Sequence, residues 1–233
     1  MKRLISLLAV LVTFTAAQDF GYETTVLSEY RSFGFGYNTQ NFRASSSNTL
    51  HDTDRIAFST NMPMLELRQD NGRLAIGYQS YTDRNGKSKK AYSVFGETHN
   101  DIPLTGSKGS RSMFAVPIAV SANYVKADAQ NRTYSNFDIG SLGVGTGIKY
   151  RYFDRSFGLQ AFVVGSLYYA SEGFSTNYGS QTSLAGEVQL VFGDLLFDGI
   201  LIGCRYEFQK WNMSDSAMDY QRQHQGAFIG ILF

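Results

Sequence analysis

A histidine-based mechanism has few candidate residues, because the chain has only three histidines, His51, His99 and His224. His51 lies close to Asp52 and Asp54, and a carboxylate beside a histidine orients the imidazole in many hydrolases. His224 lies near the carboxyl end of the chain. No set of a serine, a histidine and an acidic residue has a spacing that indicates a hydrolase. The sequence therefore predicts no catalytic residue.

A glycine-rich segment, GVGTGIK at 143–149, has some likeness to a phosphate-binding loop. It lacks the Gly-Lys-Ser/Thr ending of that loop, and its glycines alternate along an extended segment. We interpret Gly143, Gly145 and Gly147 as a stripe on the inner face of a strand, which permits curvature or leaves room for large side chains from an opposite wall. The single Cys204 and the dispersed histidines have no metal-ligand spacing, so no metal or other cofactor is expected.

The elements that position these residues are predicted to be strands, because period-two alternation dominates the chain after its amino-terminal segment. In SLAGEVQLVF (183–192) apolar residues alternate around Glu187. In ILIGCRYEFQKW (200–211) Arg205 and Glu207 occupy the face opposite an apolar stripe. Strands with one apolar and one polar face are typical of a transmembrane barrel, which has lipid outside and a polar interior.

Ten antiparallel strands are expected, and an eight-stranded barrel is the alternative if the weak first and fourth strands lie outside the wall. The expected strands are 24–38, 54–69, 73–82, 91–98, 112–125, 137–150, 157–170, 183–193, 200–211 and 221–233. We expect a bulge or an irregular edge at Pro63. Because lipid cannot satisfy free backbone groups, the first and last strands must pair to close the barrel.

The connections between the expected strands alternate in length. The longer polar connections are 39–54, 83–90, 126–136, 171–182 and 212–223; the shorter ones are 70–72, 151–156 and 193–199, with 99–110 intermediate. Long extracellular loops and short periplasmic turns are the organisation of outer-membrane barrels. An even number of strands places both termini at the periplasmic rim.

Five charged residues are expected to form a network inside this barrel: Glu97, Lys149, Glu187, Arg205 and Glu207. Such a network is either the constriction of a pore or a set of ion pairs that fills a narrow lumen. We favour the ion pairs, because small barrels have interiors just wide enough for side chains and buried charges need partners.

Composition is consistent with a membrane barrel. Aromatic residues make up 15% of the chain, with 23 glycines and three prolines. Aromatic residues near strand ends are expected to form girdles at the membrane interfaces; they are Tyr78, Tyr81, Tyr124, Tyr150, Tyr152, Phe153, Tyr168, Tyr169, Phe192, Tyr206 and Trp211. Twenty-one basic and 20 acidic residues indicate no binding of nucleic acid, and one cysteine excludes an internally disulfide-bonded domain.

The first 17 residues are predicted to be an export signal. Lys2 and Arg3 precede an apolar run at 4–14, and small residues at 15–17 precede Gln18. The expected organisation is a signal peptide at 1–17 and a barrel domain at 18–233. No later segment approaches the roughly 20 apolar residues of a membrane-spanning helix.

The chain ends in GAFIGILF, in which Ile229, Ile231 and Phe233 share one face. With the signal, the alternating strands and the unequal loops, this ending resembles the small outer-membrane β-barrel proteins of Gram-negative bacteria. The resemblance covers essentially all of the mature chain, and it is a resemblance of architecture. It implies residence in the outer membrane among its lipids, and recognition of Ile229, Ile231 and Phe233 by the barrel-assembly machinery.

The function expected from these observations is that of a structural or surface-interaction protein, whose long loops contact an unidentified extracellular ligand. A narrow passive channel for small solutes is the first alternative. A protease or lipid-modifying enzyme, with His51 and His224 at the outer rim, is the third. The alternative fold is a soluble β-sandwich.

Overall fold

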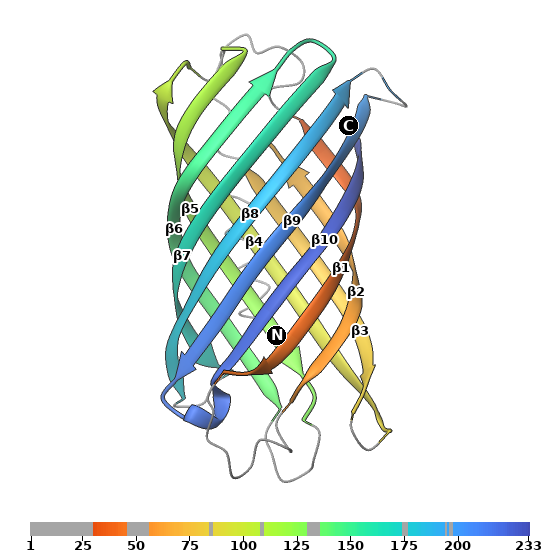
Figure 1. The fold of residues 1–233 in the computed structure, drawn as a ribbon, viewed down its shortest axis with the longest axis vertical. Coiled ribbons are helices and arrows are strands. Elements are labelled where there is room, and N and C mark those ends of the chain that lie inside the picture. The colour runs from red at the N-terminus through yellow and green to blue at the C-terminus, as the bar shows by residue number, and fades with distance from the viewer. Residues whose placement is uncertain are drawn as a thin grey trace.

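Ten antiparallel strands form one closed barrel in the computed structural model of the protein (Figure 1). The structure describes residues 30–45, 56–83, 86–107, 110–129, 136–173, 177–193, 195 and 198–233. The strands are β1 (Arg31–Ala44), β2 (Phe58–Gln69), β3 (Gly72–Thr82), β4 (Ser88–Thr105), β5 (Ser112–Ala127), β6 (Phe137–Phe153), β7 (Phe157–Glu172), β8 (Tyr178–Gly193), β9 (Gly199–Met213) and β10 (Tyr220–Leu232). A short 3-10 helix, η2 (Ser216–Met218), lies between β9 and β10. The prediction of ten strands is confirmed, and the alternative of eight is wrong.

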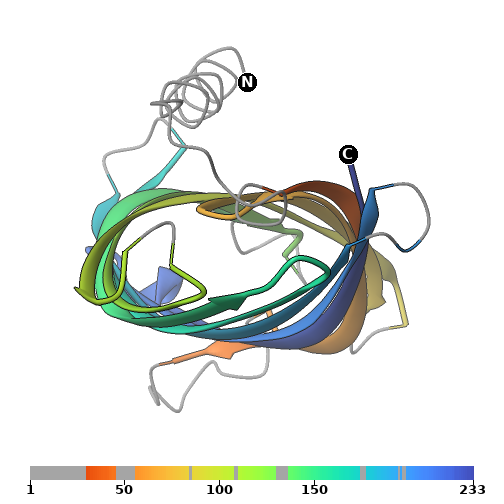
Figure 2. The same cartoon turned by 90° about the horizontal axis from the view of Figure 1, so that it is seen from above.

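The barrel closes where β1 pairs with β10, from Ser32 opposite Leu232 to Ala44 opposite Tyr220. Viewed from above, the strands form a continuous oval ring (Figure 2). The backbone N–H of Phe233 donates to the carbonyl oxygen of Arg31 at 3.1 Å. The carboxyl end of the chain and the start of the wall therefore lie at the same rim, as the even number of strands predicts.

The wall has an apolar outer face and a polar inner face along most of its height. Val144, Ile148 and Leu167 are each at least 60% exposed on the outside of the barrel. The charged residues that alternate with such positions are turned inward, and Glu187 and Arg205 are at most 5% exposed. This arrangement is the reverse of a soluble domain, so the alternating strands suit a wall that faces hydrocarbon.

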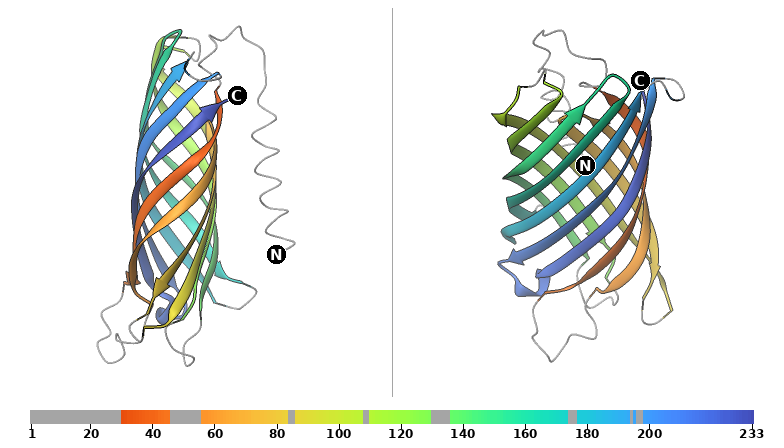
Figure 3. Two further views of the ribbon diagram at one scale, coloured as in Figure 1. Left: turned by 90° about the vertical axis from the view of Figure 1, so that its right-hand side faces the viewer. Right: turned by 45° about the horizontal axis from the view of Figure 1, so that its top comes forward.

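The two rims differ in their connections, and we name them accordingly. The turn rim carries the connections 70–71, 106–111, 154–156 and 194–198; the loop rim carries 45–57, 83–87, 128–136, 173–177 and 214–219. Most loop-rim connections are shorter than expected, because the strands continue into segments predicted to be loops. The strands have 11 to 18 residues, whereas about 9–11 residues cross a bilayer in a tilted strand. Their inclination to the barrel axis is visible in Figure 3.

Two strands differ from the prediction in their bounds. The first strand is Arg31–Ala44 rather than 24–38; the expected part before residue 30 lies outside the described residues. The alternation continues beyond residue 38, with Phe42 buried inside. The fourth strand is the longest, Ser88–Thr105, although 99–110 was expected to be a connection. His99 and Asp101 point inward while Ile102 is exposed, so the alternation persists as far as a register shift between Pro103 and Thr105.

There is no bulge at Pro63, because β2 alternates without a break and Pro63 lies opposite Tyr37 of β1. The irregularity is in the other ladder. The pairing of β2 with β3 ends at Met64 and Gly77, so that residues 58–63 and 78–82 do not pair with each other. Proline has no N–H to donate to a neighbouring strand, which fits a ladder that stops beside it. We call this unpaired stretch the β2–β3 seam; in Figure 1 the two strands diverge toward the lower rim.

No helix in the described part of the chain is long and apolar enough to cross a membrane. The expected signal peptide at 1–17 lies outside the described residues.

Candidate functional site: the lumen

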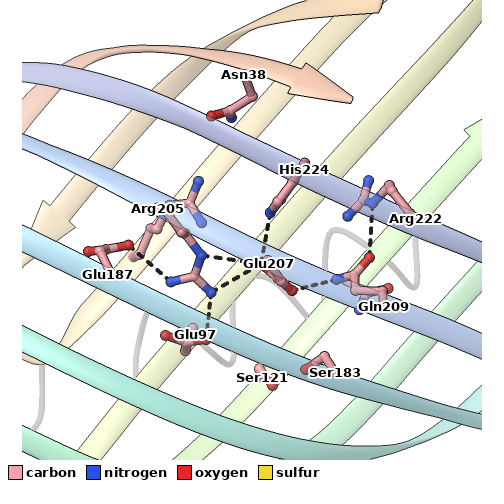
Figure 4. Close-up of polar contacts among 12 residues, drawn as sticks. Asn38, Glu97, Ser121, Ser183, Glu187, Arg205, Glu207, Gln209, Arg222 and His224 are labelled. Atoms are coloured by element: carbon pink, nitrogen blue, oxygen red, sulfur yellow. Dashed lines mark hydrogen bonds and ion pairs between the residues drawn. The ribbon is translucent and has the colours of Figure 1, made fainter. Parts of the chain in front are cut away.

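Four of the five charged residues predicted to form a network are brought together by the structure. Arg205 of β9 forms ion pairs with Glu97 at 3.3 Å, Glu187 at 3.0 Å and Glu207 at 3.1 Å. All four side chains are at most 5% exposed. Figure 4 shows the three carboxylates around the Arg205 guanidinium. Three carboxylates thus share one cation in a site shielded from water.

Some of these ion pairs cross the lumen. The strands that carry Arg205 and Glu97, β9 and β4, lie opposite each other in the ring of ten. Arg68 of β2 similarly pairs with Glu187 of β8 at 2.5 Å. Side chains from facing walls therefore meet at hydrogen-bond distance, and the lumen at this level is filled by charged groups.

Lys149, the fifth predicted member, belongs to a separate cluster nearer the turn rim. Its ammonium group is 2.8 Å from Asp101 and 3.0 Å from the side-chain oxygen of Asn71. Arg151, two residues along β6, pairs with Asp70 at 3.0 Å. Lys149 is completely buried. The sequence correctly predicted that Lys149 lies on the inner face of β6, but it did not predict the ion pair with Asp101.

Besides the two histidines described below, three charged residues of the central network were missed by the sequence reasoning, Glu66, Arg68 and Arg73. Glu66 of β2 accepts from Arg68 at 2.6 Å and from Arg73 of β3 at 2.9 Å. The available signal was the alternation of Glu66 and Arg68 with Leu65 and Leu67, which has the same form as that around Glu187.

The ionic part of the lumen is nearly balanced in charge when the histidines are neutral. Among the described residues it contains six carboxylates, Glu66, Asp70, Glu97, Asp101, Glu187 and Glu207, and six cations, Arg68, Arg73, Lys149, Arg151, Arg205 and Arg222; Asp83 is a further buried acidic residue at the loop-rim end of β3. Apart from Asp83, anions and cations are equal in number, but Arg222 forms no ion pair with any of these carboxylates. They create no strong field that would select anions or cations.

Neither of the two described histidines lies at the outer rim. His224, expected near the outer rim, points into the lumen, is 5% exposed and lies 3.0 Å from Glu207. His99 lies 2.6 Å from Glu97. Both therefore belong to the ion-pair network. His51, with Asp52 and Asp54, lies outside the described residues.

The half of the lumen nearer the loop rim contains a cluster of buried apolar side chains, which we call the apolar cluster. Its aromatic centre is formed by Phe42, Phe137, Trp211 and Tyr220, with ring centroids 5.0 to 6.3 Å apart. Buried methionines, including Met62 and Met213, complete it.

Part of the predicted aromatic girdle is therefore wrong. Tyr81, Phe153, Tyr168 and Trp211 are at most 5% exposed and point into the barrel. Tyr78, Tyr169 and Tyr206 are exposed on the outer face, as a girdle requires. The difference follows from the side of the strand on which each ring lies. Trp211, for example, is six positions beyond Arg205 on β9 and therefore shares its inner face.

The glycine stripe of β6 lies on the inner face, as predicted, but the room it leaves is used by a neighbouring strand. Tyr168 of β7 lies directly opposite Gly143, and a Cβ atom on Gly143 would be 2.5 Å from its ring. Phe228 covers Gly203 in the same way between β10 and β9. These rings pack against bare backbone of the adjacent strand and not against the opposite wall.

The closed sheet, the exposed apolar exterior and the buried ionic interior together decide what surrounds this protein. An apolar outer surface needs hydrocarbon, and only a closed sheet can satisfy its backbone there. The chain is an outer-membrane β-barrel protein. A soluble β-sandwich would hold its apolar faces inside, so that alternative is wrong.

No family model matches the sequence of this outer-membrane barrel, and no curated protein matches it. Among solved structures, it is similar to Ail, the attachment invasion locus protein of Yersinia pestis, at 14% identity and a TM-score of 0.31, covering 88% of this chain and 99% of that one. Neisserial surface protein A has 11% identity and a TM-score of 0.37, with 87% and 97% covered. Outer membrane protease OmpT from Escherichia coli has 8% identity and a TM-score of 0.36, with 88% and 96% covered. Likenesses at this level assign no role to any residue.

Proposed function

We propose that this outer-membrane barrel is a non-conducting protein that acts at its loop rim, in a structural or surface-interaction role. The observation that carries the proposal is the 3.3 Å ion pair between Arg205 and Glu97, which joins opposite walls. A hydrated solute could pass only by separating such groups, and breaking a buried pair costs about 3–5 kcal/mol. The same ion pairs disfavour the narrow channel.

The loop rim is the part of the protein that we expect to meet a partner. Its two longest connections, 45–57 and 128–136, are rich in serine, threonine, asparagine and aspartate. Polar loops on a rigid barrel can vary in sequence without disturbing the wall, which suits recognition. A rim enzyme has less support, because His224 is engaged with Glu207 inside the barrel.

Single-channel recording tests the closed lumen. Purified protein, whose folded state is established by heat-modifiable gel mobility, is inserted into planar lipid bilayers. We expect no conductance steps, whereas a porin inserted in the same way gives them. Reproducible steps from the folded protein would establish the channel instead.

Protease treatment of intact cells tests which rim faces outward. Trypsin should cleave after Arg132 in the connection 128–136, and should leave Arg155 in the turn-rim connection 154–156 uncut until the cells are broken. Cleavage at Arg155 but not Arg132 in intact cells would reverse the proposed orientation. Replacing 46–55 with a Gly/Ser linker should then leave envelope integrity unchanged if that loop serves recognition alone.

A further inference from the structure

Arg222 differs from the other cations of the lumen because it forms no ion pair with a described residue. It is 2% exposed, and its guanidinium donates to the side-chain oxygens of Gln209 at 2.9 Å and Ser93 at 3.0 Å. The nearby carboxylate of Glu207 already accepts from Arg205, Gln209 and His224. In Figure 4 Arg222 lies beside Gln209, away from the three carboxylates around Arg205. A buried guanidinium with only neutral partners is costly, and an anion would compensate it.

A second unsatisfied group lies on β3, the strand that pairs with β4, which carries Ser93. Ser93 of β4 lies opposite Gly77 of β3, and Gln79 is the next inward residue of β3. Gln79 is 3% exposed, and neither its amide nitrogen nor its amide oxygen has a hydrogen-bond partner among the described residues. Buried side-chain amides are normally hydrogen-bonded, so this one indicates a missing polar partner.

The surroundings of the two groups suit an apolar chain. The apolar cluster lies beside both groups. At one end the side chain of Met62 lies against Gly77. At the other end the ring centroid of Trp211 is 6.0 Å from the Arg222 guanidinium carbon. Methionine side chains are unbranched and flexible, and they repack readily around a ligand. The ion-pair network closes this compartment toward the turn rim.

The β2–β3 seam provides access from the side. All the other ladders described continue close to the loop-rim ends of their strands, whereas β2 and β3 separate after Met64 and Gly77. Side chains close the seam in place of backbone hydrogen bonds, because the rings of Phe58 and Tyr81 stack across it with their centroids 4.2 Å apart. Asn61 and Ser80, the outward residues beside the seam, are polar. The outer side of the seam is therefore at the level of the lipid headgroups.

We propose that the loop-rim half of the lumen binds a long-chain carboxylate, an amphiphile of the fatty-acid class, which enters from the membrane through the β2–β3 seam. Its carboxylate pairs with Arg222 and accepts from the Gln79 amide. Its chain lies among the methionines and aromatic rings of the apolar cluster. This site is closed at its base and is therefore compatible with a barrel that does not conduct.

Photolabelling of the purified full-length barrel in nanodiscs tests the site. The probe is dodecanoate with a diazirine at its terminal carbon, and labelled peptides are identified by mass spectrometry. We expect label on lumen-facing residues such as Met62 and Trp211. Unlabelled dodecanoate should displace the probe at a concentration at least about tenfold lower than dodecan-1-ol, because a hydrogen bond to a charged group is worth that much. Equal displacement by acid and alcohol, or label only on outward residues such as Ile76, would overturn the proposal and leave a site filled by water.

Substitution of Arg222 tests whether its guanidinium binds the carboxylate. Arg222→Gln should abolish the preference for the acid over the alcohol, whereas Arg111→Gln, an exposed arginine at the turn rim, should retain it. Retention of the preference by a folded Arg222→Gln protein would contradict the assignment. Should that variant fail to show heat-modifiable mobility, the comparison of acid with alcohol on the unsubstituted protein still decides.

A disulfide across the seam tests the route of entry. Asn61 of β2 and Ser80 of β3 are outward residues on either side of the seam, each three positions beyond the last pair, Met64 and Gly77. Asn61→Cys with Ser80→Cys, in a Cys204→Ala background, should slow labelling while oxidised, and reduction should restore it. The matched control is Thr39→Cys with Asn61→Cys, which joins a paired ladder at the same height and should not slow labelling. Equal rates for the two oxidised proteins would exclude the seam as the entrance.

Discussion

The ring of Tyr168 packs over the backbone of Gly143, its direct partner across β6 and β7. A methyl group at position 143 would lie 2.5 Å from that ring, so either the ring or the strand has to move. We expect Gly143→Ala to lower the free energy of unfolding by about 1–3 kcal/mol, as overpacking does. Gly140→Ala is the control on the same strand, because its Cβ would meet nothing within 4 Å. Equal effects in urea unfolding from lipid vesicles would contradict this packing.

Removal of the Arg205 charge should be among the most damaging changes in the lumen. Arg205→Gln leaves Glu97, Glu187 and Glu207 without their shared partner. Loss of one partner from a buried ion pair costs about 3–5 kcal/mol. Arg111→Gln provides the comparison, since its 3.8 Å pair with Asp154 is exposed and is expected to contribute less than about 1 kcal/mol. Similar urea midpoints for the two variants would show that the network is not stabilising.

A charge on the outer wall should be costly at mid-height and tolerated near the loop rim. Val144 is 62% exposed on the outer face of β6, in the apolar part of the wall. Val144→Arg is expected to lower the free energy of unfolding in vesicles by about 2–4 kcal/mol. Ser59→Arg, outward but beside the loop rim, should cost no more than about 1 kcal/mol. The reverse order would place the bilayer at a different height on the barrel.

We propose that the assembly machinery reads Ile229, Ile231 and Phe233, whose side chains are all exposed on the outer face of the wall. Phe233→Ser should therefore reduce the amount of folded barrel in cellular outer membranes while leaving refolding of the purified protein nearly unchanged. The matched variant is Phe33→Ser, which removes another outward phenylalanine, from β1. An equal loss in cells for the two variants would indicate a general effect of apolar surface.

Alternation along a strand was sufficient to predict most of the wall. Because successive side chains point to opposite faces, the charges at Glu187 and Arg205 identified the lumen side of β8 and β9. Trp211 shares a face with Arg205, so the same alternation places it inside. The girdle interpretation is wrong there because proximity to a strand end does not determine which face of the strand a ring occupies.

The partners across the lumen could not be predicted. Which walls face each other depends on the number of strands and on the stagger between them, and neither is a local property of the sequence. The 3.3 Å contact of Arg205 with Glu97 joins residues 108 positions apart, and it exists only because β4 and β9 are opposite in a ring of ten. The β2–β3 seam has the same origin, because Pro63 indicates an irregularity without indicating which ladder ends.

The height of the barrel has a mechanical consequence. Strands of up to 18 residues are longer than the bilayer requires, so the wall continues into the water beyond the headgroups. At the loop rim most of the connections between strands are short, and η2 lies just beyond the end of β9. Apart from the two longer connections, 45–57 and 128–136, a molecule that approaches from that side meets the stiff edge of a cylinder. Recognition there would be governed by the shape of this edge as much as by the sequence of its loops.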